Sequence, residues 1–413
     1  MANRRSALAI AFVAAAFLAP AAAQKVKIPK YKLDPYTKNK PENLKKAGYV
    51  SFGPFPFGEH GSQIISSERI EQHLLYAQII WVETAHFRIA CTLQPWQVPN
   101  DLETRRKIQA ELERLREKLG PKVNPKTRIL DRWLRLHLTA QRMEDLYADL
   151  QSWLIVKDED FPIDAAHKKY GELYMGEGRY LGMAEKYLVM VMDKGNTYFD
   201  YLKNFTGRQS KFGQRWHYMK QGSLYYGIGS DMGKGSLKHD TALHNDLIFN
   251  VTINMIDGFR HYSYDLPVWI REGLGHWFER KNSPKWNTFD QDEAAPMDPP
   301  SKWRWKPYVR QLLMGKKWSK FSDVIKWRHY GEINFNDHVM LWARIDFLLS
   351  FGKEKFRKFM FEIKGRFDHK TGRSDHHDIV GVVREAMRKT YGLNPLNFDE
   401  KFKEWAIANY PLQ

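Results

Sequence analysis

The stretch that says most about the fold is Pro267-Val268-Trp269-Ile270-Arg271-Glu272-Gly273-Leu274-Gly275-His276-Trp277-Phe278-Glu279. Pro267 is well placed to open a helix, because proline lacks the N–H group that the first turn of a helix leaves unpaired. We predict this helix over residues 268–280. The sequence before it predicts another helix over residues 238–256, and a loop through Tyr262-Ser263-Tyr264 joins the two. These two consecutive helices form the centre of the predicted fold.

The same stretch resembles the P-x-W-x-x-E-G-x-A-x-x-F-E helix of gluzincin metallopeptidases, and is most similar to that of the peptidase-MA-like exported bacterial proteins. In that family the helix follows another helix that carries an H-E-x-x-H motif. The glutamate of the E-G pair supplies the third zinc ligand, so the resemblance assigns this role to Glu272. The resemblance also implies a cleft between two lobes.

Further segments are similar to the same family. They are residues 83–89 in an early strand, residues 142–147 in the long helix behind it, and residues 351–359 and 398–405 in C-terminal helices. The resemblance implies an α+β, helix-rich fold in which a small, mostly antiparallel sheet packs on the two site helices. The predicted parts are a signal peptide at 1–23, a basic, proline-rich extended arm at 24–63, a gluzincin-like N-terminal lobe at 64–281 and a helical C-terminal lobe at 282–413.

The first site helix departs from the family at the residues that carry catalysis. His244 stands where the first histidine of H-E-x-x-H belongs, but Asn245 replaces the glutamate and Ile248 replaces the second histidine. A catalytic zinc needs three protein ligands and an open position for water, and the glutamate takes a proton from that water. The sequence therefore favours a catalytically inactive protein that binds no cofactor and keeps its cleft for a peptide or a cell-envelope polymer.

A second hypothesis is a rebuilt metal site. Asp240 and His244 are four residues apart and share a helix face, so they could bind zinc together with Glu272 and, more weakly, His276. This arrangement would support a zinc-dependent hydrolase, although it supplies no general base. The alternative is that Asp240 stabilises the positive end of its helix, while His244 and Glu272 form a hydrogen bond across the two packed helices.

The N-terminus predicts export. Arg4 and Arg5 precede an apolar run over residues 7–19, and Ala21-Ala22-Ala23 form a small-residue cleavage pattern that ends at Ala23. The apolar run is too short to span a bilayer comfortably, and no later segment has the length of uncharged sequence that a spanning helix needs. We therefore expect a periplasmic or secreted protein without a transmembrane segment after cleavage.

The charge and the aromatic residues suggest a third hypothesis. Lys and Arg total 65 against 48 Asp and Glu, which gives a net charge of +17 and favours anionic partners. Export makes nucleic acid an unattractive partner. Trp286, Trp303 and Trp305 lie among Lys and Arg in the loop 282–306, where they could stack on an anionic polymer or cover a groove between helices. The chain could thus be a cell-envelope binding module that uses the arm and these tryptophans.

Hydrophobic periodicity predicts the other elements independently of the resemblance. Apolar residues at helical spacing predict helices over residues 102–119 and 126–154, and alternation predicts a buried strand over residues 86–93. Strands over residues 215–219 and 223–226 are expected to pair around the turn Lys220-Gln221-Gly222. C-terminal helices are predicted over residues 308–313, 337–349, 353–363, 379–390 and 398–408. The single Cys91 falls in the buried phase of its strand.

Overall fold

The computed structural model describes residues 28–167, 173–263, 265–289, 303–328, 333–368, 371, 373–375 and 377–412. Its main sheet has the strand order β3-β4-β7-β9-β8, with the bounds Ile80–Glu83, Phe87–Cys91, Tyr187–Met192, Ser223–Gly229 and Gln214–Tyr218. The two outer pairs are antiparallel, whereas β4, β7 and β9 run parallel. The sheet is therefore mixed, and the expectation of a mostly antiparallel sheet is corrected.

The parallel pairs follow from the connections between the strands. Parallel neighbours need a long crossover, and α3 (Leu102–Leu119) and α4 (Arg132–Leu154) supply one between β4 and β7. Helix α5 (Gly195–Thr206) and strand β8 lie between β7 and β9. All six residues of β7 are buried, as is typical of a strand covered on both faces.

Two neighbouring tyrosines of β9 show which helices cover the two faces of the sheet. The ring of Tyr225 stacks on Tyr201 of α5 at 5.7 Å between centroids, while the hydroxyl of Tyr226 donates to Asp246 at 2.6 Å. Asp246 belongs to α6 (Asp240–Gly258). Because consecutive strand residues point to opposite faces, α5 and α6 lie on opposite sides of the sheet.

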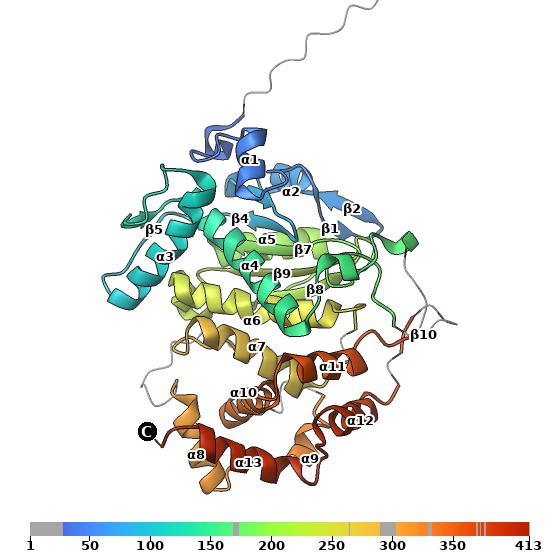
Figure 1. Cartoon of the computed structure of the whole chain (residues 1–413). Coiled ribbons are helices and arrows are strands. Elements are labelled where there is room, and N and C mark those ends of the chain that lie inside the picture. Colours follow the sequence, from blue (N-terminus) through green and yellow to red (C-terminus); the bar gives the residue numbers. More distant parts are fainter. Residues whose placement is uncertain are drawn as a thin grey trace, which may run out of the picture.

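The C-terminal part is helical and packs beneath the sheet-bearing part (Figure 1). Helix α7 (Val268–Asn282) lies between α6 and α10 (Phe335–Leu349). The remaining helices are α8 (Trp305–Met314), α9 (Phe321–Val324), α11 (Lys353–Ile363), α12 (Ile379–Tyr391) and α13 (Phe398–Asn409), with a small strand pair of β10 (Phe367–Asp368) and β11 (Arg373–Ser374). One continuous hydrophobic core joins both parts, so α7 is shared between them.

The described part of the predicted extended arm, residues 28–63, is folded against the domain. It contains α1 (Pro41–Ala47) and β1 (Pro56–His60), and β1 pairs with β2 (Gln63–Ser66), which leads into α2 (Ser67–His73). Asp34 and Phe57 are fully buried. A second small pair, β5 (Trp96–Gln97) and β6 (Ile129–Leu130), flanks α3 and α4. Burial of these side chains explains why a lysine- and proline-rich segment is not an extended arm here.

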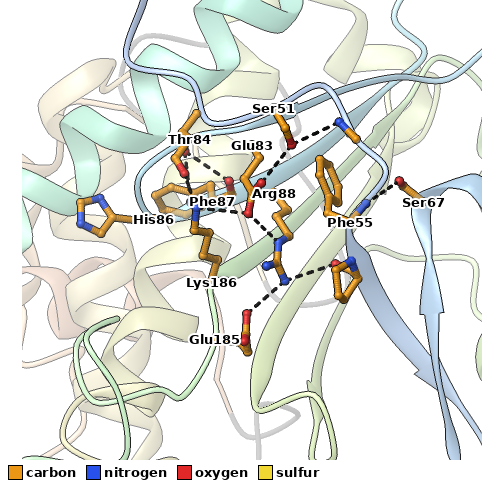
Figure 2. Close-up of polar contacts among 12 residues, drawn as sticks. Ser51, Phe55, Ser67, Glu83, Thr84, His86, Phe87, Arg88, Glu185 and Lys186 are labelled. Atoms are coloured by element: carbon orange, nitrogen blue, oxygen red, sulfur yellow. Dashed lines mark hydrogen bonds and ion pairs between the residues drawn. The ribbon is translucent and has the colours of Figure 1, made fainter. Parts of the chain in front are cut away.

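A buried charge cluster attaches this N-terminal segment to the sheet (Figure 2). Glu83 on β3 accepts from Ser51 at 3.0 Å and from Arg88 on β4 at 3.0 Å, and Lys186 lies 3.2 Å away. Burial alone would raise the pKa of Glu83, but the charges of Lys186 and Arg88 lower it below its usual value. The carboxylate is therefore ionised and joins three chain segments.

Two of the sequence-based expectations concern export and membrane insertion. The signal peptide predicted over residues 1–23 lies outside the described residues. Among the described helices, none combines the length and the hydropathy that crossing a membrane requires.

Candidate functional site

Helix α7 lies very close to both of its neighbours, and its two glycines make this possible. A Cβ atom on Gly275 would lie 2.7 Å from the ring of Phe249 on α6, and a Cβ atom on Gly273 would lie 2.7 Å from the backbone oxygen of Leu341 on α10. Interiors packed to this density leave no room for a larger residue. The segment 272–276 is thereby held between the two helices.

Glu272, His276 and His338 come together in the interior between α7 and α10. His338 Nδ1 lies 3.0 Å from His276 Nε2 and 3.2 Å from Glu272 Oε2, and these last two atoms are 3.8 Å apart. Glu272 and His276 are fully buried, and His338 is 8% exposed. Neither carboxylate oxygen of Glu272 has a hydrogen-bond partner within the part of the chain that the structure describes. These three side chains form a group that could hold a metal ion.

The other ring nitrogen of His276 is held by Glu279 on the same helix. His276 Nδ1 lies 2.7 Å from Glu279 Oε1, and the backbone N–H of Thr288 donates to both oxygens of Glu279 at 3.0 and 3.2 Å. Burial lowers the pKa of His276 well below its usual range, so the imidazole is neutral. It also raises the pKa of Glu279 well above its usual range. This contact fixes the ring so that Nε2 faces Glu272 and His338.

Asp240 and His244 belong to a different cluster, where α6 meets α3 and α4. The guanidinium of Arg142 donates to Asp240 and to Glu111, each at 2.6 Å. Lys107 Nζ lies 3.0 Å from His244 Nδ1. Burial, followed by the charges of Lys107 and Arg142, lowers the pKa of His244 well below its usual range. The side chains of Asp240 and His244 thus take part in a buried ion-pair network.

The rebuilt metal site considered from the sequence is therefore divided between two places. Glu272 and His276 lie together in the group with His338, whereas Asp240 and His244 contact the network around Arg142. Instead of the expected hydrogen bond to Glu272, the described contact of His244 is with Lys107.

Asn245, which the resemblance placed at the position of the general base, connects α6 to the chain that follows α7. Its amide Nδ2 donates to the backbone oxygens of Ser283 at 2.7 Å and Trp286 at 2.5 Å, and its Oδ1 accepts from Asn282 at 2.5 Å. Asn245 is fully buried, and Ile248 is 6% exposed within the core. Both departures from H-E-x-x-H are therefore packing residues in this fold.

A cleft of about 860 Å³ lies between strand β8 and helix α6. Its walls include Gln214 and Trp216 of β8, Asn250 and Asn254 of α6, and Arg271, Tyr262, Phe212 and Met219. Among the strands that the structure describes, β8 is at the edge of the sheet and pairs with β9 alone. Phe249 and Phe289 line the cleft and also pack on the ring of His276, at 5.0 and 5.7 Å between centroids. The metal-ligand group thus lies behind an aromatic wall of the cleft.

The three tryptophans of the loop 282–306 lie in different surroundings. Trp305 is 1% exposed, and the guanidinium of Arg280 lies 3.7 Å from its ring centroid. Trp286 is partly buried and stacks on His239 at 4.8 Å. Trp303 is also partly buried and, with Trp305, lines a hollow of about 350 Å³. Trp305 therefore packs in the interior, and the other two are available only in part for stacking on a ligand.

His338 was not among the site residues predicted from the sequence. This residue lies in the first turn of α10, just after Asn334, whose side chain accepts from the backbone N–H of Asp337. The capping pattern could have located the start of the helix. No local signal distinguishes His338 among the 15 histidines of the chain. Its role depends on how α10 docks against α7.

Comparison with known proteins adds no relative to this description. No family model matches the chain, and neither the curated proteins nor the solved structures contain a significant match.

Proposed function

We propose that this protein is an exported, gluzincin-like binding protein without peptidase activity, which holds an extended peptide in the cleft along β8. The observation that carries the proposal is the position of the cleft beside an edge strand. An edge strand presents backbone N–H and C=O groups that an extended chain can pair with. Asn250 and Asn254 on the opposite wall are buried, and their amide groups donate to Asp246 and Tyr225 within the protein, so the pairing surface of the cleft is that of β8.

The composition of the cleft supports a peptide over a purely anionic polymer. Arg271 lines the cleft, but its guanidinium donates to Asp257 at 2.8 Å, so this positive charge is paired within the protein. Trp216 and Phe289 line the cleft and are partly exposed, so they supply apolar surface for side chains. Backbone pairing along one wall with apolar contacts along the other is the usual arrangement for recognising extended peptides.

The absence of peptidase activity is supported by the residues at the family's catalytic positions. Asn245 uses its amide to hold the backbone of Ser283 and Trp286, and Ile248 packs in the core. Proton transfer from a metal-bound water needs a basic group within hydrogen-bond reach, and an asparagine amide is not basic. The side chain at position 245 is therefore not a group that could activate water for hydrolysis.

The proposal is tested by peptide binding with a matched pair of variants. Met219 lines the cleft and is 77% exposed, whereas Leu75 is 76% exposed and is not among the cleft residues. A library of random-sequence peptides too short to fold would be screened against the parent protein by fluorescence polarisation. We expect Met219→Glu to weaken the selected peptides by about tenfold, which is about 1.4 kcal/mol, and Leu75→Glu to leave their affinity unchanged.

Two results would contradict the proposal. Equal peptide affinity of the Met219→Glu and Leu75→Glu variants would show that the cleft is not the binding site. Hydrolysis of the selected peptides that stops on adding EDTA would show that the protein is a metallopeptidase.

A further inference from the structure

The zinc site that the resemblance implies does not fit this chain. It would need the side chains at positions 244 and 248 beside Glu272, but His244 lies against Lys107 and position 248 is a buried isoleucine. Glu272 nevertheless keeps a fully buried carboxylate whose two oxygens have no hydrogen-bond partner among the described residues. Burying a carboxylate that is neither paired nor neutralised costs roughly several kcal/mol, so a cation bound at this place would stabilise the fold.

We propose that Glu272, His276 and His338 bind a divalent transition-metal ion, and that the donor set of two imidazoles and one carboxylate favours zinc. This site differs from that of the family in two of its three ligands. It goes beyond the peptide-binding function proposed above and does not depend on it.

The hydrogen atoms available inside the triangle do not satisfy its acceptors. When His276 donates its Nδ1–H to Glu279, as histidine ligands commonly do to a carboxylate, its Nε2 is a lone pair that faces His338. The one N–H that can point into the triangle is that of His338 Nδ1, which lies near both His276 Nε2 and Glu272 Oε2. One donor cannot neutralise a carboxylate and also pair with a second acceptor. A metal ion accepts electron pairs from all three groups at once.

The spacing of the three atoms suits a metal ion. Their separations are 3.0, 3.2 and 3.8 Å. Bonds of 2.0–2.1 Å in a tetrahedral zinc site place neighbouring ligand atoms about 3.3 Å apart, which lies within this range. Small side-chain shifts would bring the atoms to equal spacing.

The surroundings of the triangle also suit a metal ion. Histidine ligands commonly donate their other N–H to a carboxylate, which orients the ring. Glu279 holds that position beside His276, and the backbone N–H of Thr288 fixes Glu279 in turn. Glu279 is thus a positioning residue for the site.

The site connects two parts of the fold. Glu272 and His276 come from α7, and His338 comes from α10 of the C-terminal helical part. All three residues are buried behind Phe249 and Phe289, which favours a structural ion over one that exchanges substrates. Because the ion binds the folded arrangement, its binding free energy stabilises the fold.

The test measures metal in untagged protein. The parent, His338→Gln and His244→Gln would each be incubated with zinc, dialysed into metal-free buffer and analysed by plasma mass spectrometry. We expect about one ion per chain in the parent and in His244→Gln, and a loss of more than about tenfold in His338→Gln. We expect Glu279→Gln to weaken zinc affinity by about 10–100-fold, as loss of an orienting partner does.

A second measurement covers the case in which His338→Gln does not fold. Thermal unfolding of the parent, followed by circular dichroism, should shift to lower temperature after EDTA treatment and recover when zinc is added back. Folded parent protein that retains no zinc, manganese, iron or cobalt after loading would overturn the proposal. Equal zinc content in His338→Gln and His244→Gln would overturn it as well.

Discussion

Replacing Asn245 by aspartate is the sharpest test of the structural role of this residue on α6. The change keeps the size of the side chain but removes the amide that donates to Ser283 O at 2.7 Å and to Trp286 O at 2.5 Å. Each broken bond leaves a buried carbonyl oxygen, at a cost of about 1–3 kcal/mol. Two such losses give an expected drop of about 2–6 kcal/mol in the free energy of unfolding at neutral pH.

The pH dependence gives the same test a second readout. An aspartate surrounded by carbonyl oxygens is harder to ionise in the folded protein than in the unfolded chain, so its folded pKa lies above the ordinary value. The protonated acid is a donor, and its contribution to stability is present below the unfolded pKa of about 3.9 and lost as the pH rises through the folded pKa. Asn245→Asp should therefore differ least from the parent in acid.

Urea unfolding followed by tryptophan fluorescence, at neutral and acidic pH, measures both effects. Asn245→Ala is the matched control, since it breaks the same bonds without adding a charge, and it should show no such pH dependence. A neutral-pH loss below about 0.5 kcal/mol for Asn245→Asp, the size of an ordinary surface substitution, would refute the structural role of this amide.

Three further changes test other parts of the fold. Arg142→Met removes the guanidinium that pairs with the buried carboxylates of Asp240 and Glu111, so the free energy of unfolding in urea should fall by about 3–5 kcal/mol. A loss as small as that of a surface salt bridge would contradict the buried network. Burial alone would lower the pKa of His86, but the carboxylates of Glu144 and Asp158 raise this pKa above the ordinary value of 6.5. His86→Gln should therefore lower the free energy of unfolding below pH 6.5, and this loss should vanish as the pH rises through the folded pKa. A loss that is equal at all pH values would argue against an ion pair. Gly273→Ala should lower the free energy of unfolding by about 1–3 kcal/mol, because the new Cβ atom would lie 2.7 Å from a backbone oxygen of α10. An unchanged melting temperature would mean that α7 and α10 are not in contact there.

The elements that could be predicted from sequence are those with local signals. The helix expected over residues 102–119 is α3, Leu102–Leu119, and Asp101 caps it by accepting from the backbone N–H of Thr104 at 2.8 Å. The hairpin expected around Gly222 is β8 and β9 in antiparallel register. Caps, turns and helical periodicity act over a few residues, so a single sequence displays them.

Strand β7 and its parallel pairing were missed for a physical reason. Its run Tyr187-Leu188-Val189-Met190-Val191-Met192 is buried on both faces and shows no alternation. Without alternation an apolar strand cannot be distinguished from a buried helical turn. Its partners β4 and β9 are distant in sequence, and no local pattern specifies such pairing. The expectation of a mostly antiparallel sheet came from the family resemblance, and no local signal in the sequence could correct it.

The candidate site was predictable only for the residues on one helix. Glu272 and His276 are four residues apart on α7 and so share a face, which the sequence displays. His338 reaches them because Gly273 lets α10 approach α7 closely, a feature of tertiary packing. His244 does not join Glu272 because its side chain contacts Lys107 on α3 instead. Nothing near position 244 in the sequence indicates this neighbour.

Catalysis by a metallopeptidase requires a metal, a base and a substrate cleft at one place, and this fold separates them. The cleft follows β8, the candidate metal ligands lie behind Phe249 and Phe289, and Asn245 is engaged with the chain after α7. Restoring one residue would not bring these three features together, because each is fixed by its own buried contacts. A metal ion at Glu272, His276 and His338 would accordingly stabilise the junction of α7 and α10, and the peptide binding proposed for the cleft would not depend on it. Peptide affinity and metal content should then vary separately among the variants described above.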